Sequence, residues 1–320
     1  MLLCSSSKAQ VNGAQFAFEY LRLPNAPHVT ALGGISVSNP SKDINLALQN
    51  PALMRPALHN QVSFNYNNFL SGISNTNVAY GYYAPKLNTA FALGVQYLNY
   101  GSFSQTDNVG NPTGNFKAAD YAISLAASKQ YNQRWRYGAT IKMAQSTLGE
   151  YNAMAFLADV GVAYEDTANF LTIGAVAKNM GFMAKKYSPG NNNSEPLPFD
   201  LQIGLSKRFK HLPLRLFTTI HHLYEWDVRY DNPDDKTNNS VFGSSDTSTS
   251  SKNFTDKLFR HFIFGGELTL AKRIGITVAY NHMRRKEMSI DDNKGAVGYS
   301  FGANIYLNKF QIHYARSFYK

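Results

Sequence analysis

The stretch FALGVQY, residues Phe91–Tyr97, indicates the fold class because large apolar residues alternate in it with small or polar ones. A period of two places successive side chains on opposite faces of a β-strand. Similar alternation recurs from about residue 61 to the end of the chain, from Val62-Phe64-Tyr66 to Phe310-Ile312-Tyr314. Divided at its turn residues, this region gives about thirteen segments of strand length. The sequence therefore predicts an all-β chain.

The second face of these strands separates a barrel from a soluble sandwich, which also alternates. In a sandwich that face meets bulk water and favours Lys, Glu and Thr. Here it carries Gly, Ala, Ser, Asn and isolated charges, as expected for a crowded lumen in which charges pair or meet water. We therefore predict a transmembrane antiparallel β-barrel, with structural charges that face the lumen and pair across it: Asp120, Lys142, Asp159, Asp200, Arg215 and Glu267.

The links between the predicted strands alternate in length. Short links such as 84–89, 130–134 and 165–169 are separated by longer ones at 99–117, 181–196, 227–257 and 283–295. Outer-membrane barrels have short periplasmic turns and longer extracellular loops, and single-chain bacterial barrels have an even number of strands. We expect an integral outer-membrane protein with its long loops outside the cell and its short turns in the periplasm. We also expect fourteen strands, with the last one absent from this sequence or a strand miscounted.

Composition excludes several other classes of protein. The chain has 20 Tyr and 21 Phe against 2 Trp, and this aromatic content suits a β-rich protein. It has no apolar run long enough for a helical membrane span, which excludes a helical membrane protein. Its net charge of +10 is scattered along the sequence, which does not favour a nucleic-acid surface and suits loops that meet anionic lipopolysaccharide or a partner. The single cysteine, Cys4, excludes a disulfide framework and a cysteine-based metal site.

The residues ahead of the barrel lack the period-two pattern. We expect residues 1–9 to be the residual end of a signal peptide, although no full apolar core precedes Ala9, and a lipoprotein cysteine at Cys4 is a weaker interpretation. Residues 10–60 are predicted to form a hatch with a short helix over 43–50, and residues 61–320 to form the barrel. A fourteen-strand lumen is too wide for wall side chains to fill, so a plug is expected. A periplasmic tail is the alternative.

No constellation of catalytic or cofactor-binding residues is apparent. His221 and His222 are adjacent and would point to opposite faces of a strand, so we expect lumen or interface residues there and no metal site. No phosphate loop or nucleophile elbow occurs, and we expect neither a cofactor nor catalysis. The polar 227–257 loop is the expected partner-binding loop, through Asp231, Asn232, Asp234, Asp235, Lys236 and Asn238.

Many short stretches together resemble one family. They include Tyr20–Pro24, Ala31–Gly34, the hatch motif Asn50-Pro51-Ala52-Leu53, the stretch 62–66 and Val297–Gly302, and they are spread over about 10–317. On these residues the chain resembles the PorQ family, outer-membrane components of the type IX secretion system of Bacteroidetes-group bacteria. That family is related to PorV and to the FadL-type fatty-acid transporters, which share a fourteen-strand barrel with an N-terminal hatch.

The resemblance implies a non-catalytic role in the cell-surface attachment complex. The expected partners are a PorZ-like surface protein held at the outer membrane, the sortase PorU and the shuttle PorV, together with outer-membrane lipid and lipopolysaccharide. The alternative is a FadL-like channel for hydrophobic small molecules. Such a channel needs an apolar pocket near the hatch, and inward Leu98, Leu157 and Phe217 keep this alternative open.

Overall fold

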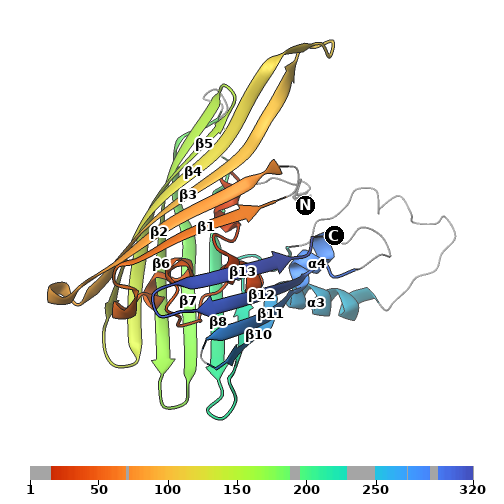
Figure 1. The fold of residues 1–320 in the computed structure, drawn as a ribbon. Helices are drawn as coiled ribbons and strands as arrows, with labels where there is room; N and C mark the ends of the chain where they lie inside the picture. The colour runs from red at the N-terminus through yellow and green to blue at the C-terminus, as the bar shows by residue number, and fades with distance from the viewer. Residues whose placement is uncertain are drawn as a thin grey trace, which may run out of the picture.

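The computed structural model describes residues 16–69, 72–187, 195–228, 249–271, 273–288 and 295–319. The described residues form one 13-stranded sheet in which every strand pairs with its neighbours in the chain. Figure 1 shows the sheet curving round into a barrel wall. The thirteen strands and the all-β class predicted from the sequence are confirmed. The strands are β1 (Gln61–Asn68), β2 (Ser74–Ala84), β3 (Thr89–Thr106), β4 (Pro112–Gln130), β5 (Trp135–Leu148), β6 (Tyr151–Asp166), β7 (Leu171–Lys185), β8 (Asp200–Arg208), β9 (Leu214–Ile220), β10 (Phe262–Leu270), β11 (Ile274–Asn281), β12 (Tyr299–Tyr306) and β13 (Gln311–Ser317).

The outer face of the wall is apolar and aromatic. Large hydrophobic side chains at alternate positions stay exposed on strand after strand, for example Leu93, Ile123, Ile141, Phe156 and Ile276. A soluble protein rarely leaves such a continuous apolar surface in water, whereas a transmembrane barrel presents it to lipid. No helix within the described residues has the length and hydropathy needed to cross a membrane.

The two ends of the barrel differ in their connections. At one end, here called the turn end, consecutive strands are joined by short links, including η5 (Pro85–Leu87), as the sequence predicts. At the other, the loop end, the predicted alternation with long loops is wrong in part. Only Gly149 and Glu150 separate β5 from β6, and most of the predicted loop 99–117 is strand, because β3 runs to Thr106 and β4 starts at Pro112.

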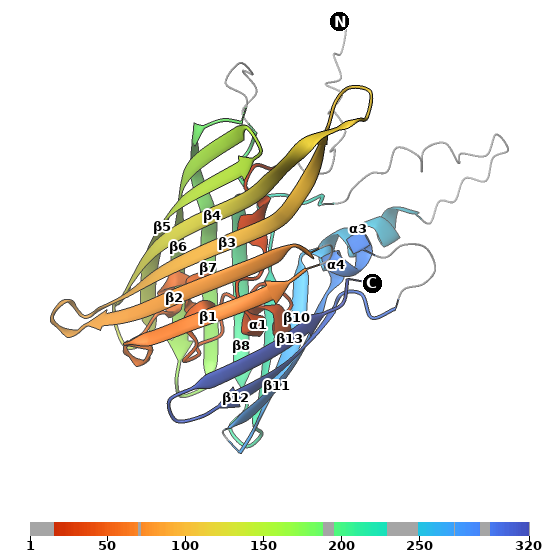
Figure 2. The same cartoon turned by 45° about the horizontal axis from the view of Figure 1, so that its top comes forward.

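The hairpin of β3 and β4 was predicted as a loop because its upper part is rich in Ser, Gln, Asn and Gly. Within it, Phe103 faces Phe116 across the pair, and their rings stack with centroids 5.4 Å apart. An aromatic cross-strand pair of this kind extends a ladder that the polar neighbours alone would not favour. Two other loop-end links contain helices: α3 (Thr249–Arg260) lies between β9 and β10, and α4 (His282–Met288) lies between β11 and β12. The two helices pack against each other, and α4 also contacts β10 (Figure 2).

The described part of the N-terminal segment lies against the inner face of the wall. It contains η1 (Glu19–Arg22), α1 (Pro27–Ala31), α2 (Ile44–Gln49), η2 (Pro51–Leu53) and η3 (Pro56–Leu58). Asp43 caps α2 through the backbone N–H of Asn45, and the helix ends at Gln49, because Asn50 ahead of Pro51 is extended. Figure 2 shows these short helices inside the curve of the sheet. The core therefore lies between this segment and small inward residues such as Ala79, Ala126 and Ala163.

Within the described residues the sheet has two edges, because β1 and β13 each pair with one neighbouring strand. Both views show these strands next to each other (Figures 1 and 2), and Figure 2 shows α1 behind them, where it contacts β13. Their outward side chains are more exposed than those on most interior strands, as Phe64 at 71% and Tyr314 at 68% illustrate. That a fourteenth strand completes the wall stays a prediction.

Two wall glycines allow the N-terminal segment to approach closely. A Cβ atom at Gly174 would collide with the backbone carbonyl of Val37, and one at Gly161 would collide with the side chain of Asn50. Backbone atoms cannot rotate away from such a clash. Glycine at these positions therefore sets the distance between the segment and the wall.

We predict that Gly174→Ala lowers the free energy of unfolding by about 1–3 kcal/mol through overpacking. Gly266→Ala is the matched control, because its added Cβ would have its nearest neighbour at 3.4 Å, an ordinary contact. It should be neutral or stabilise by about 0.5–1 kcal/mol, since alanine restricts the unfolded chain. Urea unfolding of both variants in detergent, followed by fluorescence, measures the difference. Equal stabilities would contradict the close approach.

Candidate functional site

The predicted hatch motif is the point at which the N-terminal segment is bonded to itself and to the wall. The side-chain oxygen of Asn50 accepts a hydrogen bond from the N–H of Ala52 at 3.1 Å, and its amide nitrogen donates to the carbonyl of Val37 at 2.9 Å. Pro51 begins η2, and this short helix, which ends at Leu53, packs against β4, β5 and β6. The motif thus forms a tight, fully bonded turn with no free group for ligand chemistry.

Two of the predicted lumen charges form a buried ion pair. Lys142 on β5 and Asp159 on β6 lie 2.6 Å apart, and the Asp159 side chain is fully buried. The backbone N–H of Asn179 donates to the second carboxylate oxygen at 2.8 Å. Beside this pair, the ammonium group of Lys178 donates to Gln49 of α2 at 3.0 Å. Lys178 therefore connects the wall directly to the N-terminal segment.

A second pair lies on β9 and β10. The guanidinium of Arg215 is 3.1 Å from a carboxylate oxygen of Glu267 and also donates to Asn39 of the N-terminal segment. The other oxygen of Glu267 faces His28 of α1 at 3.7 Å. Ion pairs between the predicted lumen charges therefore form at two places, but each joins neighbouring strands and neither crosses the lumen as expected. At both places a neighbouring or shared side chain of the wall also contacts the N-terminal segment.

The remaining predicted lumen charges accept hydrogen bonds from neutral donors, so the expected pairing with cations is wrong for them. Tyr100 donates to Asp120 at 2.6 Å. Asp200 accepts from the side chain of Gln202 at 2.6 Å and from the backbone N–H of His222 at 2.7 Å. All three partners are polar groups that the pattern of small inward residues does not reveal.

The orientation of the His221 and His222 rings differs from the one predicted from the sequence. Strand β9 ends at Ile220, and His222 has a positive φ of 55°, so the two rings do not point to opposite faces. Both are buried, and their Nδ1 atoms are 2.5 Å apart. Burial lowers the pKa of His221, and the neighbouring His222 lowers it further, which favours a neutral ring that shares one proton with its neighbour. The two rings therefore lie buried together at the end of β9.

The site that sequence reasoning missed lies around His28. Its Nδ1 atom is 3.1 Å from Asp43, and the ring of His313 on β13 stacks on it with centroids 5.1 Å apart. Burial alone would lower the pKa of His28, but the carboxylates of Asp43 and Glu267 raise it to about 9. His313 alternates with outward Ile312 and Tyr314, and this is the sequence signal that could have placed its ring in the lumen.

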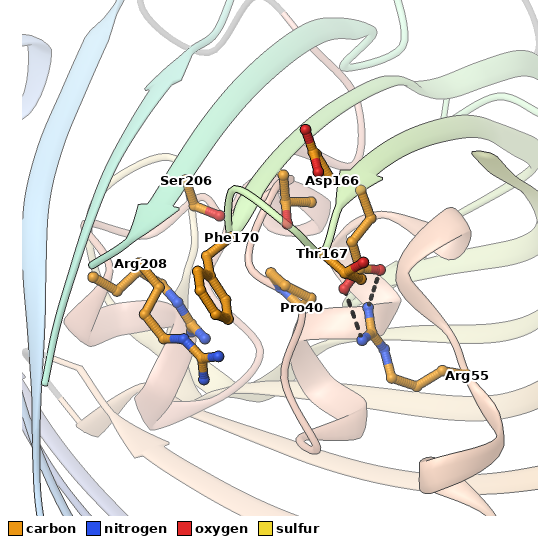
Figure 3. Close-up of a pocket in the computed structure, with 10 residues that line it drawn as sticks. Pro40, Arg55, Asp166, Thr167, Phe170, Ser206 and Arg208 are labelled. Carbon is orange, nitrogen blue, oxygen red and sulfur yellow. Dashed lines mark hydrogen bonds and ion pairs between the residues drawn. The ribbon is translucent and has the colours of Figure 1, made fainter. Parts of the chain in front are cut away.

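Cavities occur at both ends of the barrel, and a smaller one lies beside α2. At the turn end, a pocket of about 280 Å³ is lined by Pro40, Arg55, Glu165, Phe170 and Arg208, among others (Figure 3). Arg55 and Glu165 approach to 3.5 Å on its wall. A cavity between the N-terminal segment and strands β2 to β7 measures only about 60 Å³, room for about two water molecules.

The pocket at the loop end is larger and mainly apolar. It measures about 550 Å³ and lies on the inner face of the β3–β4 hairpin and the start of β6, lined mostly by Tyr100, Phe103, Phe116, Leu148 and Tyr151. We call it the mouth pocket. Within the lumen at this end, a buried cluster of small and large apolar side chains packs together: Ala17, Phe18, Tyr20, Leu98, Ala122, Ala144, Ala153, Ala155 and Leu157.

A second apolar surface lies at the loop end around α3. Leu223, Tyr224, Trp226, Phe254 and Phe259 are each about 40–57% exposed. The ring of Trp226 contacts those of Phe254 and His261, with both centroid distances at 5.7 Å. We call this group the aromatic platform. The predicted partner-binding residues Asp231, Asn232, Asp234, Asp235, Lys236 and Asn238 lie outside the described residues, in the segment between Trp226 and α3.

The chain is similar to known proteins in its fold, and no sequence match accompanies that similarity. No protein-family model matches the chain, and no curated protein matches it. Among solved structures, the chain is similar in fold to the toluene transporter TodX of Pseudomonas putida. That similarity has 14% sequence identity and a TM-score of 0.49, and it covers 92% of each chain.

The buried pair of Lys142 and Asp159 gives a direct test of the interior. We predict that Lys142→Met lowers the free energy of unfolding by about 3–5 kcal/mol, because it leaves the Asp159 carboxylate buried without its cation. The double variant Lys142→Met/Asp159→Asn removes the charge and keeps an acceptor for the Asn179 N–H, so it should regain most of this loss. Glu19→Gln, at a half-exposed carboxylate paired with Arg22, is the control and should cost less than about 1 kcal/mol. A double variant no more stable than Lys142→Met would refute the pairing.

Proposed function

We propose that this chain is a non-catalytic outer-membrane barrel, closed by its N-terminal segment, that holds a partner protein at its loop end. The observation that carries the proposal is the filled interior. Asn50, Gln49, Asn39 and His28 of the segment each meet wall groups or buried carboxylates, and the cavity beside α2 is about 60 Å³. A barrel filled in this way offers its outer rim, rather than its lumen, as the working surface.

The aromatic platform is the surface that we assign to the partner. Exposed Trp, Tyr and Phe side chains dominate the energetics of many protein interfaces, because they bury large areas with little loss of rotamer entropy. In the sequence, Trp226 and Phe254 of the platform stand on either side of the polar segment that is predicted to bind a partner.

The identity of the partner rests on the sequence resemblance. A PorZ-like surface protein, with PorU and PorV in the same attachment complex, is the partner that this resemblance implies. The loop end would then face the outside of the cell and the short turns the periplasm. No family model and no curated protein matches the chain, and the solved structure that is similar in fold is a transporter. The attachment role therefore depends on the resemblance and on the filled interior.

We predict that replacing Trp226 and Phe254 together by Ser abolishes co-purification of the PorZ-like protein from detergent-solubilised membranes. The two side chains are 52% and 57% exposed, so the barrel itself should remain folded. Tyr131→Ser, at a 77% exposed aromatic residue on the turn end, is the matched control and should leave co-purification intact. Quantitative mass spectrometry of the eluates gives the readout. Unchanged recovery from the double variant would remove the platform from the proposal.

The second candidate function is a FadL-like route for hydrophobic small molecules, and the mouth pocket favours it. Its volume of about 550 Å³ and its aromatic lining are within the range of small-molecule sites. TodX is described as a toluene transporter, so toluene is a suitable probe. Binding at the mouth would be compatible with either function, whereas passage through the wall would support only transport.

Transport and anchoring predict different behaviour in vesicles. If the barrel anchors a partner, vesicles that contain it should take up toluene no faster than vesicles of lipid alone, and planar bilayers should show no steady conductance. A variant lacking residues 16–58 should conduct ions, because removal of the segment empties the lumen. Uptake that depends on the intact barrel and falls when Phe103→Asp alters the pocket would favour the transporter instead.

A further inference from the structure

Three metal-ligating side chains from three separate elements meet inside the barrel. They are His28 of α1, Asp43 at the start of α2 and His313 of β13, and their donor atoms all lie within 4.8 Å of one another. His28 Nδ1 is 3.1 Å from Asp43 Oδ2, and His313 Nε2 is 3.9 Å from the same oxygen. Donor atoms around a tetrahedral zinc ion are roughly 3.3 Å apart, so shifts of a few tenths of an ångström to about 1.5 Å would bring these three into range.

The hydrogen bonds around His313 leave its Nε2 atom available. Asn304 on β12 places its side-chain oxygen 2.8 Å from His313 Nδ1, and its amide nitrogen faces the hydroxyl of Thr277. Since Nδ1 donates to that oxygen, the neutral ring carries its lone pair on Nε2, which faces Asp43. A lone pair and a carboxylate repel each other unless a cation lies between them.

His28 has the outer partner that is usual for a metal-bound imidazole. Its Nδ1 atom faces Asp43, while its Nε2 atom faces the carboxylate of Glu267 at 3.7 Å, beyond hydrogen-bond distance. That Nε2 atom is buried without a hydrogen-bond partner, in a residue that is 1% exposed. Metal-ligating histidines commonly donate their second N–H to a carboxylate, which fixes the tautomer and orients the ring. A small rotation of His28 towards a bound ion would leave Glu267 in that role.

Asp43 is held in the same way by groups that do not compete for the ion. Its Oδ1 atom accepts hydrogen bonds from the backbone and side chain of Asn45, at 2.9 and 2.7 Å. This leaves Oδ2 directed at both imidazoles. No other group of three or more His, Cys, Asp or Glu donors converges in this manner within the described residues.

We propose that His28, Asp43 and His313 bind a first-row transition-metal ion, Zn²⁺ in preference to Mg²⁺ or Ca²⁺. Two imidazoles and one carboxylate are the ligand set that zinc accepts, whereas magnesium and calcium require mainly oxygen donors. The ion would join two elements of the N-terminal segment to β13. Because β13 is paired on one side only, such a bond would fasten the segment to the edge strand of the wall.

Direct metal binding tests the proposal. Tag-free full-length protein, stripped with EDTA and re-equilibrated with Zn²⁺ in detergent, should retain about one equivalent of zinc after desalting, as measured by plasma mass spectrometry. Co²⁺ in its place should give the strong visible absorption of a tetrahedral site with nitrogen ligands. Zinc should also raise the unfolding temperature. Retention of less than a tenth of an equivalent by the wild-type protein would overturn the proposal without any variant.

Two histidine variants assign the binding to this site. His313→Ala should lose the retained zinc and the cobalt spectrum, and both should be kept in the control His282→Ala. His282 also lies beside a carboxylate, at 3.2 Å from Asp256, but it belongs to the loop end of the barrel. Heat-modified migration on gels shows whether each variant is folded. A folded His313→Ala protein that keeps its metal, or a folded His282→Ala protein that loses it, would refute the assignment.

Discussion

The structure depends on the small size of the side chains that line the wall. Gly161 and Gly174 let the N-terminal segment touch the backbone of the strands, and inward alanines continue this surface along the lumen. A wall of this width built from large inward residues would exclude the segment, and a wall of small residues alone would leave a water-filled pore. The outward apolar face and the inward small face are therefore two halves of one pattern. The outward apolar side chains suit contact with lipid, and the small inward side chains leave room for the N-terminal segment.

Once the segment is inside, polar groups that it buries must find partners, because an unpaired buried polar group costs about 1–3 kcal/mol. The segment carries Asn39, Asp43, Gln49 and Asn50, and each has a hydrogen bond or an ion pair with the segment itself or with the wall. The inward charges of the wall serve the same purpose. Lys178 and Arg215 are each directed at an oxygen atom of the segment. The charged side chains of the wall and the polar groups of the N-terminal segment are thus complementary.

The fold could be predicted from the sequence where the period of two was uninterrupted, as in FALGVQY and the strands that follow it. Prediction was wrong where polar residues continued a strand, as in the β3–β4 hairpin, and where a turn was compressed to Gly149 and Glu150. Both errors arose because pairing with a neighbouring strand outweighs local composition. The inward positions of Lys142 and Asp159 followed from the pattern. Their partners, and the convergence of His28, Asp43 and His313, depend on contacts between residues distant in the chain.

The arrangement of apolar and polar surface inside the barrel bears on which of the two functions it can perform. A hydrophobic molecule in the mouth pocket would next meet the buried cluster around Tyr20, Leu98 and Leu157. Beyond that cluster lie Lys142, Asp159 and Lys178, whose hydrogen bonds it could not replace. Passage would require the segment to leave several bonded positions together, and a metal ion at His28 would add to that cost. The same bonds cost nothing in a barrel that holds a partner, since a rigid support loses less entropy when the partner binds.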